Sequence, residues 1–201
     1  MIQIVKDSDT RPWFFLQTAH TTYGMWVMET GHLEHLYYGE RITVDSQNPS
    51  SCAPLVIQRA FAPGNTCTYD REHPQISMED ICLEVGTLGK GDIREPFLEV
   101  RFADGSVTSD FTFDSYEVIT LKEREQCLQD SGLPHSYSEA ETDSVECLQI
   151  ILQDVTNHLE LQLFYTLFEE CDVITRSARL INHSDATVTL NRCLSAQLDL
   201  T

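Results

Sequence analysis

Residues 159–167 read LELQLFYTL, and this alternation of apolar and polar side chains decides the fold class. One face of the segment would carry the apolar set, which is Leu159, Leu161, Leu163, Tyr165 and Leu167. The other face would carry Glu160, Gln162, Phe164 and Thr166. A period of two residues is typical of a β-strand that buries one of its faces. The stretch therefore predicts a half-buried strand of an antiparallel sheet.

Further strand-like segments lie on both sides of this stretch. After it, Val173–Leu180 is a second run, Asn182-His183-Ser184-Asp185 supplies a turn, and alternation resumes through Val188, Leu190, Leu194, Ala196, Leu198 and Leu200. Before it, similar runs cover Trp13–Thr18, Tyr23–Glu29, Leu33–Tyr38, Ile81–Val85, Phe97–Phe102, Val107–Tyr116, Glu117–Leu121 and Val145–Leu152. About ten to fourteen short strands with no helix predict an all-β fold, an antiparallel two-sheet β-sandwich.

Two long stretches lack a period. Asp45–Pro74 gathers proline, serine and asparagine, whereas Lys122–Ser144 is charged and rich in serine. Connections longer than about 15 residues are uncommon in compact domains unless they are functional or disordered. We therefore expect long irregular loops, and we look for function in the first of them. Between the two, Asp104-Gly105 predicts a tight hairpin turn.

The alternation runs on to Thr201 without a polar tail or a terminal helix. The termini of a complete domain usually fray into solvent, whereas an apolar strand needs cover on its buried face. We therefore expect residues 1–201 to be one domain and a fragment of a longer protein.

The charge of the chain excludes some partners. It has 32 acidic and 13 basic residues, for a formal net charge of −19. Neither nucleic acid nor an anionic membrane surface is an expected partner, because each requires a basic face. No segment resembles a signal peptide, and none approaches the roughly 20 apolar residues of a membrane span. Seven cysteines without close pairing favour a reducing compartment, so we expect a cytoplasmic protein.

Two sets of possible metal ligands are better explained by packing. His32 and His35 are three residues apart, a spacing that sends their side chains to opposite faces of a strand. Cys52, Cys67 and Cys82 recur at a regular interval, but zinc ligands of structural sites are closely paired. We therefore expect no metal and no cofactor.

Neither a phosphate site nor a catalytic pair stands out. Gly86, Gly89 and Gly91 precede no helix that could hold a phosphate, so we expect them to be turn residues. A glycosidase needs two carboxyl groups at a defined separation, and 32 acidic residues on strands and loops single out no pair. The residues by themselves therefore identify no catalytic pair.

Four aromatic side chains could stack on a sugar ring, namely Trp13, Trp26, Tyr37 and Tyr38. Each lies in a strand-like run in which one face must belong to the core. Tyr37 and Tyr38 are neighbours and therefore point in opposite directions. We expect core packing for most of this set.

Three blocks of the sequence carry a family resemblance. They are GHLEHLYYGERI at 31–42, GTLGKGDIREPFLEVRFADGSVTSDFTF at 86–113 and CDVITRSARLINHSDATVTLNRCLSAQLDL at 171–200. In this order they resemble the amino-terminal domain of bacterial retaining α-galactosidases of glycoside hydrolase family 36. The resemblance implies a β-sandwich, a so-called supersandwich, that precedes a catalytic (β/α)8 barrel. It also implies a structural ion pair between Asp92 and Arg94. The barrel is absent from these 201 residues.

The resemblance implies an activity for the whole enzyme. That activity is hydrolysis of terminal α-galactosides such as melibiose and raffinose by a homotetramer, with an aspartate nucleophile and an aspartate acid/base in the barrel. This part alone is then expected to be inactive. A raffinose-type synthase or an α-N-acetylgalactosaminidase stays open as the parent enzyme. So does a free-standing carbohydrate-binding or interaction module without catalysis.

The resemblance also implies that the first long loop leans over an active site of the tetramer and contacts substrate. The matching stretch here is Ile57–Arg71. Arg71 is one candidate, because its fixed N–H donors suit sugar hydroxyls. Gln58 is the other, at a point where the family often has an acidic residue, and its amide still bonds a hydroxyl. Gln58 and Arg71 are the predicted substrate-binding residues.

Overall fold

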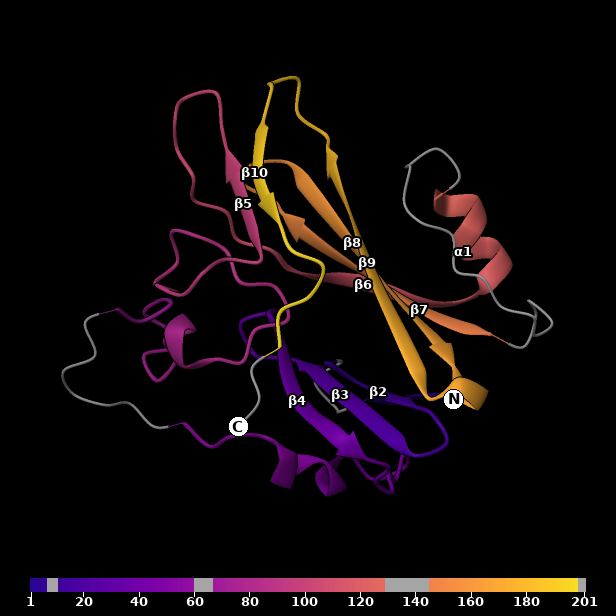
Figure 1. The fold of residues 1–201 in the computed structure, drawn as a ribbon. Helices are drawn as coiled ribbons and strands as arrows, with labels where there is room; N and C mark the ends of the chain where they lie inside the picture. Colours follow the sequence, from indigo (N-terminus) through magenta and orange to yellow (C-terminus); the bar gives the residue numbers. More distant parts are fainter. Residues whose placement is uncertain (7–10, 60–66, 129–144, 199–201) are drawn as a thin grey trace.

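The protein is a β-sandwich of two facing antiparallel sheets, as predicted (Figure 1). The structure is a computed structural model that describes residues 1–6, 11–59, 67–128 and 145–198. The first sheet contains, in order, β1 (Ile2–Lys6), β2 (Pro12–Gln17), β3 (Thr21–Val27) and β4 (Leu33–Glu40). The second contains β6 (Thr112–Thr120), β7 (Glu146–Asp154), β8 (Leu159–Phe168) and β9 (Val173–Asn182). A separate two-stranded ribbon pairs β5 (Leu98–Arg101) with β10 (Thr189–Cys193).

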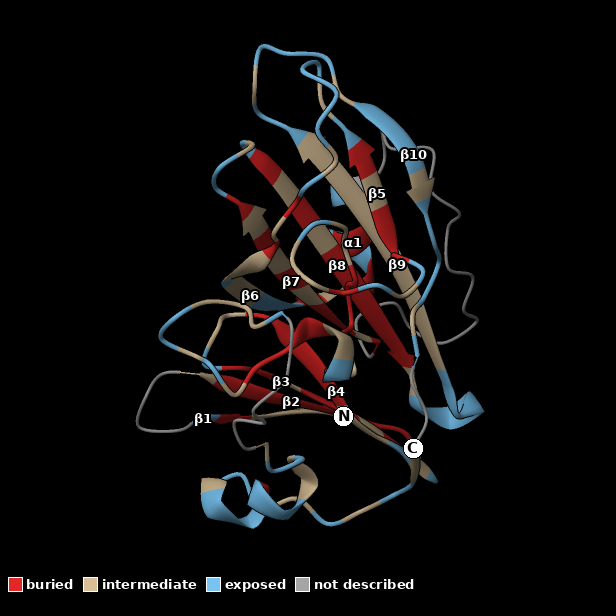
Figure 2. Ribbon diagram, turned by 90° about the vertical axis from the view of Figure 1, so that its left-hand side faces the viewer, coloured by how far each residue is buried: buried red, intermediate tan, exposed pale blue. Residues whose placement is uncertain are grey.

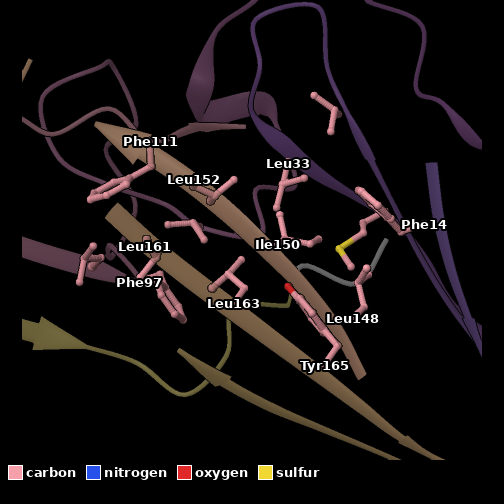
Figure 3. Packing of buried hydrophobic residues seen from close by; sticks show 14 of the residues in the cluster. Phe14, Leu33, Phe97, Phe111, Leu148, Ile150, Leu152, Leu161, Leu163 and Tyr165 are labelled. Carbon is pink, nitrogen blue, oxygen red and sulfur yellow. The ribbon is translucent and has the colours of Figure 1, made fainter. Parts of the chain in front are cut away.

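The main core lies between the two sheets (Figure 3). The first sheet contributes Phe14, Leu16, Met25, Val27 and Leu33, and the second contributes Leu148, Ile150, Leu152, Leu161, Leu163 and Tyr165. The predicted apolar face of β8 is at most 3% exposed at all five positions. Figure 2 shows this burial as red strands that face one another. The period of two in the sequence therefore identified the core face of this strand.

The other face of β8 is also partly buried, on the side of the second sheet where a helix lies. Phe164 and Thr166 are fully buried, and Phe164 packs with Ile119 and Cys147. The helix is α1 (Leu121–Leu128), which Figure 1 shows on the outer side of the second sheet. Its Arg124 donates a hydrogen bond to Ser177 Oγ of β9.

The expectation of no helix and of an irregular segment from Lys122 onward is wrong for residues 122–128. A capping box begins the helix. The backbone N–H of Thr120 donates to Glu123 Oε2 at 2.8 Å, and the backbone N–H of Glu123 donates to Thr120 Oγ1 at 3.3 Å. The pattern Thr-x-x-Glu is a known helix start. The rest of the predicted irregular segment, 129–144, lies outside the described residues.

Some expected strands are shorter than predicted, and one strand was missed. Ile81–Val85 makes only a single bridge, Leu83 to Glu34 on β4. Residues 107–111 are not a strand, because Ser109 hydrogen-bonds to the Leu88 carbonyl instead of to β5. The alternation after Val188 forms a strand only over Thr189–Cys193. β1 was not predicted.

The described part of the first long loop packs in part against the outer face of the first sheet. It contains the short helices η1 (Pro49–Ser51) and η2 (Ala53–Leu55). Cys52 between them is buried in a second cluster with Val5, Trp13 and Phe15. A third short helix, η3 (Met78–Asp80), follows the loop, and η4 (Glu169–Cys171) joins β8 to β9. In the described ranges no helix is long and apolar enough to cross a membrane.

Candidate functional site

The start of β4 organises three clusters of buried charge. His32, Glu34 and His35 are each less than 8% exposed, and each contacts a different set of partners. Both histidines are buried, and each lies beside its own buried or half-buried carboxylate. Among the described residues no group of three or more histidine, cysteine or acidic side chains is arranged to hold a metal ion.

The first cluster surrounds Glu84, which is fully buried. Tyr23 and Tyr165 donate their hydroxyls to its two carboxylate oxygens, and His35 Nδ1 lies 3.3 Å from one of them. The Arg176 guanidinium donates to the Glu84 carbonyl at 2.7 Å and lies over the ring of Phe97. Burial opposes ionisation, but these donors outweigh it and hold the pKa of Glu84 below its usual range. This cluster joins the two sheets inside the sandwich.

The second cluster fixes the chain beside Gln58. Glu34 is 1% exposed and accepts hydrogen bonds from Trp26 Nε1 at 2.7 Å and from Arg59 Nη2. The same guanidinium donates to the carbonyls of Ile57 and Asp80, each at 3.3 Å. The backbone on both sides of Gln58 is therefore tied to β4 and to η3.

The third cluster surrounds Asp110. His32 Nε2 and Lys90 Nζ each lie 2.9 Å from its carboxylate, and the Tyr69 hydroxyl donates to it at 3.0 Å. Burial raises the pKa of this carboxyl, but the hydrogen bonds from His32 and Lys90 prevail and lower it to about 2. Asp110 is therefore an ionised hub between β4, the first long loop and the segment that precedes β6.

The two predicted substrate-binding residues lie at opposite ends of the stretch 57–71 of the first long loop. Gln58 and Arg71 are both exposed. Within the described part of the chain, neither side chain makes a hydrogen bond or an ion pair with another residue. Residues 60–66, which lie between them, are outside the described residues. The role of both side chains in binding substrate stays a prediction.

In the glycine-rich block the expected ion pair is confirmed, and two of the three expected turn glycines, Gly89 and Gly91, lie in bends, whereas Gly86 does not. Arg94 makes a bidentate pair with Asp92, from Nε to Oδ1 and from Nη2 to Oδ2, each at 2.9 Å. Gly89 and Gly91 have φ values of 94° and 92°, a region that favours glycine. A side chain at Gly91 would also approach Cys67 Sγ to within 2.6 Å.

The aromatic residues are mostly used for packing. Trp13 is buried and stacks with Trp26 at a centroid distance of 4.8 Å. Tyr37 donates its hydroxyl to the Glu40 carbonyl. Tyr38, at 50% exposure, is the one aromatic side chain among the described residues with a largely exposed ring. A carbohydrate-binding platform of several aromatic rings is therefore absent from the part that the structure describes.

Sequence reasoning missed Glu34, Tyr69, Glu84 and Asp110, although a signal for two of them was present. Glu34 and Glu84 each interrupt an apolar strand-like run, HLEHLYY and ICLEVG. Charged residues are almost never fully buried unless they are paired. A glutamate at such a position therefore predicts a buried partner, but it does not say which residue that partner is.

Comparisons with known proteins agree on one family. A family profile described as the glycosyl hydrolase family 36 N-terminal domain matches residues 31–201. The chain is similar to the bifunctional α-galactosidase/sucrose kinase AgaSK of Mediterraneibacter gnavus, at 35% identity over 187 residues. It is also similar to α-galactosidase AgaA of Geobacillus stearothermophilus, at 32% identity over 186 residues. Each match covers 92% of this chain but only 18% and 24% of the two relatives.

Solved structures give the same result. The crystal structure of the α-galactosidase from Lactobacillus brevis matches with a TM-score of 0.79 and 31% identity, over 98% of this chain and 24% of that one. A Geobacillus stearothermophilus AgaA variant in complex with raffinose matches with a TM-score of 0.78 and 28% identity, over 92% of this chain and 24% of that one. The chain therefore spans about a quarter of the length of these proteins.

Proposed function

Since the chain belongs to glycoside hydrolase family 36, as an N-terminal domain of that family, we propose that it is the non-catalytic sandwich of an α-galactosidase. The whole enzyme hydrolyses terminal α-galactosides with retention of configuration. Its two catalytic aspartates lie on a (β/α)8 barrel outside these 201 residues. The observation that carries the proposal is the profile match over residues 31–201, in agreement with a TM-score of 0.79 over 98% of the chain.

The hydrogen bonds of the buried carboxylates support the proposal that the catalytic residues lie outside this domain. A retaining glycosidase needs two carboxyl groups about 5 Å apart on either side of the bond to be cleaved. Glu34, Glu84 and Asp110 instead each accept from two or more donors of the fold. Their role is to hold segments together.

We assign two roles to the sandwich. Gln58 and Arg71 donate hydrogen bonds to the hydroxyls of a bound galactoside at an active site of a cytoplasmic homotetramer. The apolar side chains that alternate along the C-terminal segment supply contacts to the rest of the enzyme. Leu190, Leu194 and Leu198 are 50%, 38% and 41% exposed, although their alternation is that of a strand with a buried face.

The test begins with the coding sequence downstream of Thr201. We expect it to continue for at least the roughly 250 residues of a (β/α)8 barrel. The full-length protein should then release galactose from raffinose, with the α-anomer as the first product seen by NMR. A stop codon directly after Thr201, or an inverted first product, would contradict the proposal. Transfer of galactose to sucrose in place of hydrolysis would identify a synthase.

A further inference from the structure

Tyr69 is held from several sides, two residues before Arg71. Its hydroxyl donates to Asp110 Oδ2 at 3.0 Å, and its backbone N–H donates to the Ile76 carbonyl at 2.8 Å. Its ring meets the His32 ring edge to face at a centroid distance of 5.0 Å, and Lys90 Nζ lies 5.3 Å from its centre. Such a set of contacts restrains the side chain at its ring and at its hydroxyl.

The charges around Tyr69 keep its hydrogen bond intact. Burial, followed by the neighbouring Asp110 carboxylate, raises the pKa of the Tyr69 hydroxyl above its usual range. Asp110 is ionised at ordinary pH, since its pKa is about 2. At ordinary pH the hydroxyl is therefore the donor and the carboxylate the acceptor, and such charge-assisted bonds are the stronger ones.

The chain turns directly after Tyr69. Asp70 Oδ1 accepts the backbone N–H groups of Glu72 at 2.8 Å and of His73 at 2.7 Å. The backbone of Arg71 is thus held between the anchored Tyr69 and this turn. The Arg71 side chain is exposed and makes no hydrogen bond or ion pair with any described residue. A fixed backbone that carries a guanidinium with no partner among the described residues suits a group that binds a ligand.

We propose that Tyr69 is a positioning residue for Arg71, because its bond to Asp110 fixes the backbone from which Arg71 reaches the galactoside. This inference rests on the proposed function, in which Arg71 contacts substrate. Tyr69 itself contacts no substrate. The bond from Tyr69 to Asp110 lowers the conformational entropy that Arg71 loses when substrate binds. Loss of this bond therefore weakens substrate binding and leaves the chemical step unchanged.

The experiment measures kcat and KM for raffinose with the full-length enzyme and three variants, Tyr69→Phe, Arg71→Ala and the double variant. Tyr69→Phe keeps the ring and removes only the hydroxyl. We expect KM to rise about tenfold in Arg71→Ala and about threefold in Tyr69→Phe, while kcat changes by less than about twofold. In the double variant KM should equal that of Arg71→Ala alone, because Tyr69 acts through Arg71.

Tyr23→Phe is the matched control, because it also removes a hydrogen bond from a tyrosine hydroxyl to a carboxylate, but one that does not hold the first long loop. Its hydroxyl donates to Glu84 inside the sandwich. Both tyrosine variants should lower Tm, but Tyr23→Phe should leave KM unchanged. Asp110→Asn removes the charge of the group that accepts the Tyr69 hydrogen bond, and it should likewise raise KM for raffinose.

Two outcomes overturn the inference alone. One is a Tyr69→Phe enzyme with lowered Tm and unchanged KM while Arg71→Ala raises KM. The other is a Tyr69→Phe effect of equal size with and without Arg71. If Arg71→Ala itself leaves KM unchanged, the substrate contact in the proposed function fails and the inference falls with it.

Discussion

At the scale of the residue, the charged groups that interrupt the strands are what tie distant segments of this protein together. Glu34 joins β4 to the first long loop through Arg59, and Glu84 joins both sheets through Tyr23, Tyr165 and Arg176. A buried pair is weak evidence for stability, since desolvation opposes it, but removal of one partner costs about 3–5 kcal/mol. These residues therefore specify which segments meet.

Asp110 predicts a pH dependence of stability. Its pKa is about 2 in the folded protein against 3.8 as the ordinary value, so the folded state favours the ionised form. Its contribution of about 2 kcal/mol is present in full above pH 4 and is lost as the pH falls towards 2. Asp110→Asn should remove this part of the acid slope in urea unfolding between pH 5 and pH 2.5.

Ser109→Ala is the control for that experiment. Ser109 is buried beside Asp110, is uncharged, and has no partner for its hydroxyl among the described residues. This variant should shift the unfolding free energy at every pH without changing the slope. An acid slope that Asp110→Asn leaves intact would contradict the assigned role of the carboxylate.

At the scale of the element, α1 covers a face of the second sheet that the strand pattern would leave in solvent. Its first turn depends on the reciprocal bonds between Thr120 and Glu123. Beneath it lies Cys147, and burial raises the pKa of that thiol to about 11. A short helix is marginal alone, so its cap and its contacts with the sheet decide whether it forms.

Thr120→Ala should therefore loosen α1. We expect a loss of about 1 kcal/mol of unfolding free energy and a roughly fivefold faster modification of Cys147 by a thiol reagent, read by mass spectrometry of the peptide. Lys122→Ala is the control, because Lys122 is exposed on the same turn. In Lys122→Ala, Cys147 should react at the same rate as in the unaltered chain. Equal rates in Thr120→Ala and the unaltered chain would show that the cap does not protect Cys147.

At the scale of the whole molecule, the isolated chain leaves apolar side chains in solvent. Ile93 is 84% exposed, Val173 43%, Leu190 50%, Leu194 38% and Leu198 41%. Exposed apolar surface of this kind favours association. The net charge of −19 opposes association by repulsion, so the outcome depends on salt.

We expect residues 1–201 alone to bind a hydrophobic dye and to associate in 0.15 M salt, as measured by light scattering. The double variant Leu190→Ser with Leu198→Ser should reduce both signals without a loss of Tm, because both positions are exposed. Val118→Ser is the control, since Val118 on β6 has a similar exposure of 42%. A monodisperse chain that binds no dye would contradict this prediction.

The sequence by itself determined the class of the fold and its core face. The alternation in β8 needs no knowledge of its partners, because successive side chains of any strand point to opposite faces. Local chemistry also predicted the turn after Asn182 and the strands β2 to β4, and the family resemblance implied the Asp92–Arg94 pair. The Thr120–Glu123 capping box that begins α1 is also a local signal in the sequence, but it was not used to predict the helix.

The tertiary structure decided which strands pair and which charges are buried. Asp104-Gly105 does form its turn, with Gly105 at φ 87°, yet β5 pairs with the distant β10 and not with the segment that follows. An edge of a sheet offers the same backbone donors and acceptors to any strand, so the choice depends on the packing of the whole chain. The same holds for Asp110, whose partners come from three segments far apart in the sequence. Only folding brings these partners together, and the residues next to Asp110 in the sequence do not indicate which distant side chains will contact it.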